Sequence, residues 1–444
     1  MFKTKIILFV AVFISMTAFS QKKWTLKECV HHALENNISI KKNKLNIAVQ
    51  KENVVNAKGN FLPTVSASSG GNFGFGSTFD PVSKNRVATS TFGGSFGLRS
   101  GVTVFNGFRN LNTRKQAKLG VTSSQLDLEV IEDNISLNVV NSYLNILFAK
   151  ENLNVAQVQY EISKKQIERA KSQFDAGVKP KGDLLNAKST AANDAQNVIA
   201  QQNILDIALL NLAQLLQISA VNFNVAPLEI DSPSIATLYK DSNLIYEKAL
   251  LNRPEIEKAK LEIENADLSI AIAKSSYMPT VSASASASTN YGFNFDLPVG
   301  TSNKEFFKQI NDNLGYGLGF SINVPIFNGF KTDSNVNRSK INKEITEFNL
   351  ESQKLQLQQT IQKAYLDAKS SAKSYEAAEI SLSAQKEAFK NAQERYNYGA
   401  MTLFDFDQVR NRLVNAESAM IRAKYDYVFK TKVLKFYYGE SILE

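Results

Sequence analysis

The segment at positions 314–330, LGYGLGFSINVPIFNGF, alternates strictly between apolar residues and small or polar ones. A period of two is typical of a β-strand with one apolar face. The alternation is about twice as long as an ordinary strand and approaches the length with which a tilted strand crosses a bilayer. The small or polar second face suits a water-filled lumen. We therefore predict a transmembrane strand with these lipid-facing residues: Leu314, Tyr316, Leu318, Phe320, Ile322 and Val324. A long edge strand of a soluble β-sandwich is the alternative.

The N-terminal residues 1–20 have the three parts of a signal peptide. Two lysines precede an apolar run at 6–16, and the triplet AFS at 18–20 is a small-x-small cleavage site. No other stretch is apolar over the length of a membrane helix, so we expect strands to make any membrane crossing. The only cysteine, Cys29, lies away from the cleavage site. We therefore do not expect a lipoprotein.

The chain is basic, with 51 Lys and Arg against 42 Asp and Glu and a formal net charge of +9. These charges are spread along the helical stretches and form neither a clustered patch nor a known nucleic-acid-binding module. The pattern favours a solvated helical surface, and we expect no nucleic-acid partner.

Motifs of the first half of the chain recur in the second half in the same order. FLPTVSAS at 61–68 recurs as YMPTVSAS at 277–284, and VFNGF at 104–108 recurs as IFNGF at 326–330. The residues Gly177 and Asp183 recur as Gly399 and Asp405, in two Gly-x5-Asp turns. A duplication of this length predicts two tandem copies of one structural unit.

Each copy is predicted to contain helices, two membrane-length strands, a very long helix and a final helix. Residues 330–398 hold neither proline nor glycine after the IFNGF motif, so they can form one helix of about 100 Å. Apolar and small residues at four-three spacing indicate a coiled-coil seam along it. The predicted ranges are 21–217 for the first copy (helices 25–60, strands 64–76 and 92–105, long helix 108–176, helix 183–217), 218–240 for the linker, and 241–444 for the second copy (helices 241–277, strands 280–295 and 314–327, long helix 330–398, helix 402–438).

The whole mature chain resembles the TolC-type outer-membrane efflux protein family. The resemblance rests on WTLKECVHHALENN at 24–37, the two PTVSAS strands, the VFNGF and IFNGF motifs and the two Gly-x5-Asp turns. It implies a mixed α+β membrane protein in which three protomers each give four strands to one twelve-stranded barrel, continued by a periplasmic α-helical tunnel. Independently, four strands are too few to close a barrel, and open edges are not tolerated in lipid.

The resemblance also implies a function, a location and partners. It predicts a homotrimeric channel in the outer membrane of a Gram-negative bacterium, with a large periplasmic portion, serving as the passive exit duct of a tripartite efflux or type I secretion system. The implied partners are outer-membrane lipid, a periplasmic adaptor (membrane fusion) protein and an inner-membrane transporter of the RND, ABC or MFS type. Drug, peptide, polysaccharide and siderophore export all fit the sequence.

The two Gly-x5-Asp turns are expected at the closed end of the tunnel. In the family, an aspartate after the second turn forms a ring about the threefold axis, and another aspartate three residues later adds a second ring. Here the first position is Asp405 and the second is Gln408, with Asp407 beside it, while Met401 replaces a family arginine that helps to hold the end shut. The expected gate residues are Asp183, Asp405, Asp407 and Gln408. The alternative is that Asp405 only caps the final helix.

We predict no enzymatic activity, cofactor or metal site. Cys29 and His32 share a helical face next to His31, but two candidate ligands without a third do not make a metal site. The S-x-x-K pattern at 370–373 lies on the long helix without its partner motifs. Two non-enzymatic alternatives are a periplasmic adaptor and a structural coiled-coil protein. Neither explains a duplicated pair of membrane-length strands.

Overall fold

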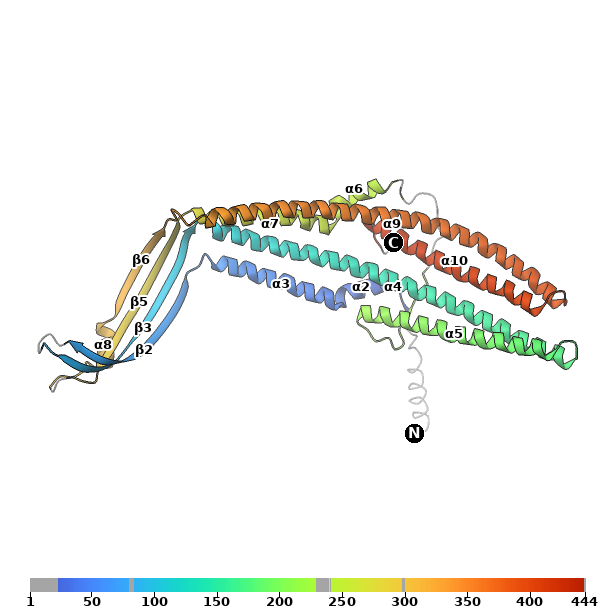
Figure 1. The fold of residues 1–444 in the computed structure, drawn as a ribbon, viewed down its shortest axis with the longest axis horizontal. Coiled ribbons are helices and arrows are strands. Elements are labelled where there is room, and N and C mark those ends of the chain that lie inside the picture. The colour runs from blue at the N-terminus through green and yellow to red at the C-terminus, as the bar shows by residue number, and fades with distance from the viewer. Residues whose placement is uncertain (1–22, 80–83, 229–238, 240, 298–299, 443–444) are drawn as a thin grey trace, which may run out of the picture. The chain divides into compact units, whose positions relative to one another are not determined.

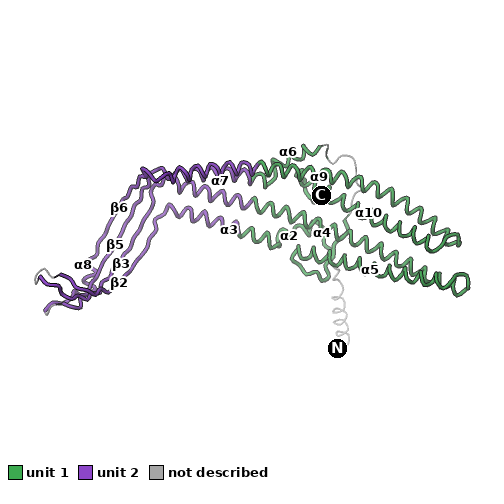
Figure 2. The backbone as a smooth tube through the Cα atoms, in the orientation of Figure 1, with its two compact units in different colours: residues 1–45, 126–257, 351–444 green, residues 46–125, 258–350 purple. Residues whose placement is uncertain are grey.

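The structure is a computed structural model that describes residues 23–79, 84–228, 239, 241–297 and 300–442 (Figure 1). The predicted signal peptide, 1–20, and most of the second half of the predicted linker lie outside these residues. The chain divides into two compact units (Figure 2). Unit 1 contains residues 1–45, 126–257 and 351–444, and unit 2 contains residues 46–125 and 258–350. Each unit therefore takes segments from both halves of the sequence.

Unit 2 contains one antiparallel sheet in the order β2-β3-β5-β6. The hairpin of the first half and the hairpin of the second half meet along β3 and β5, so one continuous ladder joins the two halves (Figure 1). β2 and β6 have no second neighbour within the described residues. The strands are β2 (Thr64–Phe79), β3 (Arg86–Asn106), β5 (Thr280–Asn294) and β6 (Gly315–Asn323).

The register of the sheet places nearly all apolar residues of the four strands on one face, with Val87 at the loop end of β3 as an exception. Leu98 of β3 pairs with Ala67 of β2 and Ala287 of β5, and Ala287 pairs in turn with Tyr316 of β6. Paired residues point to the same side of a sheet. Along β6 this face is strongly exposed, with Leu318 at 86%. The opposite face consists mainly of Ser, Gly, Thr and Asn.

β6 is shorter than the strand predicted over 314–327. Its last residue, Asn323, lies opposite Thr280, the first residue of β5. The next pair would set Val324 opposite Pro279, which has no N–H to donate, and Pro325, directly after Val324, also lacks this donor. The prediction is therefore wrong beyond Asn323, and Val324 follows the strand instead of belonging to it.

The loop ends of the sheet contain more regular structure than the pattern predicts. β2 and β3 extend past the predicted 64–76 and 92–105 to the pair Phe79 and Arg86, where mixed Ser, Thr and Ala residues give little alternation. The loop between β5 and β6 contains a short helix, α8 (Phe306–Asp312). α8 packs on β5, where Thr289 donates a hydrogen bond from Oγ1 to the Ile310 carbonyl at 2.7 Å.

The remaining elements are mostly helices. α2 begins with a capping box, in which Thr25 accepts from the Glu28 N–H and the Glu28 carboxylate accepts from the Thr25 N–H. α4 and α9 each have 67 residues. The helices are α2 (Leu26–Asn36), α3 (Ile38–Gly59), α4 (Arg109–Asp175), α5 (Lys181–Leu216), α6 (Ser242–Asn252), α7 (Pro254–Lys274), the 3-10 turn η1 (Ser275–Tyr277), α9 (Lys331–Asn397) and α10 (Leu403–Tyr438). Among the described helices, none has both the length and the hydrophobicity of a membrane-spanning helix.

The core of unit 1 packs α2, α4, α5 and α10 around a short parallel pair, β1 (Lys23–Trp24) and β4 (Asn224–Val225). Tyr143 of α4 is 1% exposed at its centre. Its hydroxyl donates to the Ala226 carbonyl at 2.7 Å and lies 3.1 Å from the Trp24 carbonyl. Burial raises the pKa of Tyr143, which keeps it a donor. The pair β1–β4 was not predicted, and it fixes part of the linker onto α4.

The VFNGF and IFNGF motifs form matching corners before α4 and α9. In each, the glycine and the phenylalanine after it have positive φ: 66° and 64° at Gly107 and Phe108, and 65° and 62° at Gly329 and Phe330. The asparagine before each glycine accepts from a backbone N–H four residues ahead. Both corners therefore use the same backbone path and the same cap.

Candidate functional site

The hairpins α4–α5 and α9–α10 end in two turns of the same geometry. Gly177 and Gly399 are in the left-handed region, with φ of 71° and 75°. The residue after each glycine donates its N–H across the end of the preceding helix, from Val178 to the Gln173 carbonyl at 2.9 Å and from Ala400 to the Arg395 carbonyl at 2.8 Å. These bonds define a Schellman motif, which satisfies the last carbonyls of a helix.

Asp405 lies in the first turn of α10 and takes part in its cap. The N-cap residue Thr402 accepts from the Asp405 N–H at 3.1 Å, and its hydroxyl donates to Asp405 Oδ2 at 2.7 Å. The other hairpin differs, because the N-cap residue of α5 is Pro180, which makes no side-chain cap, although the acidic Asp183 lies in the first turn. Asp405 therefore takes part in the cap of α10, the alternative considered in the sequence analysis, and its side chain is also exposed.

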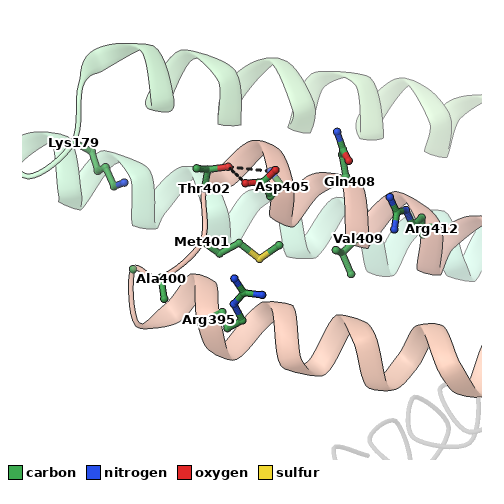
Figure 3. A pocket seen from close by; sticks show the side chains of 10 residues that line it. Lys179, Arg395, Ala400, Met401, Thr402, Asp405, Gln408, Val409 and Arg412 are labelled. Atoms are coloured by element: carbon green, nitrogen blue, oxygen red, sulfur yellow. Dashed lines mark hydrogen bonds between the residues drawn. The ribbon is translucent and has the colours of Figure 1, made fainter.

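Asp405 borders a hollow of about 630 Å³ beside the α9–α10 turn (Figure 3). Three of the lining residues are basic, and Asp405 is the only acidic one. Met401 and Gln408 also line it, so Met401 presents a thioether to the hollow. The lining residues are Lys179, Arg395, Gly399, Ala400, Met401, Thr402, Asp405, Gln408, Val409 and Arg412.

Asp407 belongs to a different environment from its neighbours Asp405 and Gln408. Its carboxylate is 3.6 Å from Nε of Arg410, and burial raises its pKa while the Arg410 charge partly opposes that shift. The sequence grouped these residues with Asp183 as one gate. Only Asp405 and Gln408 share the hollow, whereas Asp407 faces the packed helices and Asp183 lies in the first turn of α5.

Arg410 joins three helices and was not predicted from the sequence. It is 2% exposed, and its Nη1 donates to Ser163 Oγ of α4 at 2.5 Å and lies 3.3 Å from the Asp194 carboxylate of α5. It follows the buried Phe406 by one helical turn. A lone arginine on the apolar face of an amphipathic helix is the sequence signal that would have revealed this network.

A second arginine ties the two hairpins near their turns. Arg169 of α4 donates to the carbonyl of Asn397, the last residue of α9, at 2.8 Å and also bonds its side chain. The guanidinium lies over the ring of Tyr396, 5.1 Å from its centre, and that ring stacks on Phe406 of α10 with centroids 4.8 Å apart. Both arginines come from buried or packed positions and fix the two hairpins to each other.

The residues weighed as metal ligands have other contacts. Cys29 is fully buried in the core of unit 1, His31 pairs with Glu35 at 3.3 Å, and His32 packs edge-on against Trp24 with ring centres 5.1 Å apart. No group of three potential metal-ligating side chains occurs within the described part of the chain.

Comparison with known proteins adds a family and a fold. The family model described as outer membrane efflux protein matches residues 29–216 and 245–440. The chain is 21% identical over 412 residues to outer membrane efflux protein BepC of Brucella suis, covering 92% of this chain and 84% of that protein. It is 21% identical over 370 residues to outer membrane protein TolC of Escherichia coli K12, covering 76% and 73%. The crystal structure of the Campylobacter jejuni CmeC outer membrane channel aligns with a TM-score of 0.77 at 20% identity, covering 93% and 85% of the two chains.

Proposed function

The chain belongs to the outer membrane efflux protein family, and from this premise we propose that it is the exit duct of a tripartite efflux or type I secretion system. The observation that carries the proposal is the four-stranded sheet, which exposes one continuous apolar face and a second face of small polar residues. This combination suits a wall between lipid and water. The duct carries solutes passively, so its work requires no catalytic residue.

The open edges of the sheet support a trimer. β2 and β6 each leave a row of backbone N–H and C=O groups without a partner strand among the residues that the structure describes. Such groups are very unfavourable in lipid, so β6 of one protomer must pair with β2 of the next until the barrel closes. Three protomers give twelve strands, the number that the family resemblance implies.

Exposed apolar residues on the long helices support the same assembly. Along α9 they recur at coiled-coil spacing, and α5 carries a second group. These side chains need a partner, and neighbouring protomers packed side by side into a helical tunnel supply it. The exposed residues are Ile341, Ile345, Phe348, Leu355, Leu366 and Ile380 on α9, and Leu185, Ile199, Ile204, Ile207 and Leu210 on α5.

The duplication is part of the proposal. The two corners share their backbone angles and asparagine caps, and the two hairpin turns share their Schellman geometry. These matches support two copies, 21–217 and 241–444, that arose from one unit and are joined by the linker at 218–240.

The hollow at the α9–α10 turn is proposed as part of the periplasmic constriction. Three copies of Asp405 and Gln408 would meet near the threefold axis, with Asp183 and the turn glycines Gly177 and Gly399 setting the ends of the hairpins. A periplasmic adaptor and an inner-membrane transporter of the RND, ABC or MFS type would engage this end. The protein is then an outer-membrane protein without a lipid anchor, since Cys29 lies inside the core of unit 1.

Membrane extraction and electrical recording test the proposed function together. The protein should require detergent for release from outer membranes, migrate as a trimer, and form discrete conducting channels in planar bilayers. A periplasmic adaptor or a structural coiled-coil protein would give no discrete channels. Release by salt alone, with a monomeric mass and no conductance, would refute the duct.

A further inference from the structure

One face of the sheet carries a single charged side chain. We call this the small-residue face: on β3 it contains Thr91, Gly93, Ser95, Gly97, Arg99, Gly101 and Thr103, and the residues opposite them on β2, β5 and β6 are Ser, Thr, Asn and Gly. The four strands hold only one other charged residue, Arg86, which the register places on the apolar face at the loop end. Arg99 is therefore the only charged residue on this face of the four strands.

The neighbours of Arg99 leave its side chain free to extend. It forms a row across the sheet with Ser66 of β2, Ser286 of β5 and Gly317 of β6. Two positions away along β3 are Gly97 and Gly101, which have no side chains. Arg99 is exposed, and within the described residues no carboxylate or hydrogen-bond acceptor pairs with it.

We propose that Arg99, repeated once in each protomer, forms a basic belt in the lumen that attracts the carboxylate, sulfonate or phosphate groups of anionic solutes. The proposal rests on the proposed barrel, in which the small-residue face encloses water. A single exposed arginine on an open surface is screened and exerts a weak field. Three like charges inside a narrow channel with low-dielectric walls act differently, because the walls focus the field and raise the local concentration of counter-ions.

The chemistry of arginine fits this role. Its planar guanidinium presents five N–H donors and pairs with two oxygens of a carboxylate or phosphate at once. The serines beside it can donate hydrogen bonds but supply no opposing charge. Since no acid on this face neutralises Arg99, its charge determines which small ions are favoured at this level of the sheet.

A cysteine placed opposite Arg99 tests the belt directly. Ser286→Cys in the otherwise unchanged trimer is treated with two small thiol reagents of similar size, an anionic sulfonate and a cationic ammonium methanethiosulfonate, added from the loop side. The measured quantity is the rate of the anionic reagent divided by that of the cationic one, normalised to the same ratio on a free thiol in solution. This normalised ratio should be about ten, the low end of the effect of electrostatic focusing. The ratio cancels any change in the reactivity of the thiol itself. The native Cys29 is fully buried and serves as the background control in the parent protein.

Variants that change the charge at position 99 test the basic belt separately from the proposed function as a duct. Adding Arg99→Gln should reduce the ratio to that of a free thiol, Arg99→Lys should keep most of the preference, and Arg86→Gln should leave it unchanged. If Arg99→Gln leaves the normalised ratio unchanged, the proposed basic belt is wrong, but the proposed function as an exit duct is not affected. If neither reagent modifies Ser286→Cys in an intact conducting trimer, the small-residue face does not line the water path, and both the belt and the proposed facing of the sheet are overturned.

Discussion

Arg410 Nη1 of α10 lies 2.5 Å from Ser163 Oγ of α4, at a point where the same guanidinium also faces the carboxylates of Asp194 and Asp407. The arginine side chain is 3% exposed and the two carboxylates are 22% and 19% exposed. The contact therefore joins the two helix hairpins of unit 1 through charges that have largely lost their water.

Removing the arginine should destabilise unit 1 strongly. Arg410→Leu fills part of the space but leaves two partly buried carboxylates without their cation, a change that typically costs about 3–5 kcal/mol. The helical circular dichroism of the purified protein, followed during urea unfolding, measures the loss. Arg422→Leu on the exposed side of the same helix is the matched control and should shift the midpoint little. Equal effects of the two changes would show that the contacts of Arg410 do not stabilise unit 1.

The raised pKa of Asp407 predicts a pH dependence with a definite sign. Burial is the main cause, so the folded protein binds the proton more tightly than the unfolded chain does. At neutral pH the buried charged carboxylate lowers the free energy of unfolding. This loss is relieved as the pH falls through the pKa of the folded state towards the ordinary value of 3.8. Melting temperatures measured from pH 7 downwards should therefore rise in the wild type relative to Asp407→Asn. Parallel curves would show that Asp407 titrates normally.

The turn at Gly399 should not tolerate a side chain. Its φ is 75°, and an added Cβ would have no atom within 4 Å, so the cost of Gly399→Ala is that of the left-handed backbone alone, about 1–2 kcal/mol. Gly182→Ala is the matched control, since it lies in the first turn of α5 with ordinary φ and open space. That change should be neutral or stabilising by about 0.5–1 kcal/mol. Urea unfolding of both variants would decide the point.

The facing of β6 can be tested with two adjacent positions. Leu318→Arg puts a charge on the proposed lipid face, which costs roughly 2–4 kcal/mol near mid-membrane and should reduce the yield of trimer on gels. Gly317→Ser should be tolerated, since the new Cβ would meet only the rotatable hydroxyl of Ser286 at 3.1 Å. The reverse ranking would place the small-residue face towards lipid.

Local signals explain why most elements could be predicted from the sequence. Strict alternation identified β6, and the breaks at Pro63, Pro279, Gly177 and Gly399 located the ends of strands and long helices within a few residues. The predicted long helices at 108–176 and 330–398 correspond to Arg109–Asp175 and Lys331–Asn397. Such boundaries depend on residues that act on their own backbone, through φ or a missing donor.

Features that depend on distant partners could not be predicted in this way. β1 and β4 contain two residues each and exist because Tyr143 and Lys150 of α4 bind the carbonyls around them. Asp405 and Asp407 are two residues apart on α10, so the helical period alone turns them to nearly opposite sides. Which of the two sides packs against α4 and α5 depends on the orientation of α10. The two aspartates are close in sequence, but Asp405 borders the hollow and Asp407 faces Arg410.

The role of Asp405 can be decided by comparing two changes in one cap. Thr402 and Asp405 both hold the start of α10, but only Asp405 carries a charge to the hollow. If three Asp405 carboxylates meet at the constriction, they attract cations despite the basic residues nearby, and Asp405→Asn should reduce cation selectivity and weaken block by multivalent cations. Thr402→Ala removes the cap with an expected cost of about 1 kcal/mol in stability and should leave selectivity unchanged. Reversal potentials of single channels under a salt gradient, with melting temperatures of the same preparations, distinguish the two roles. An Asp405→Asn channel with wild-type selectivity and a stability loss like that of Thr402→Ala would show that Asp405 is a helix cap and forms no ring.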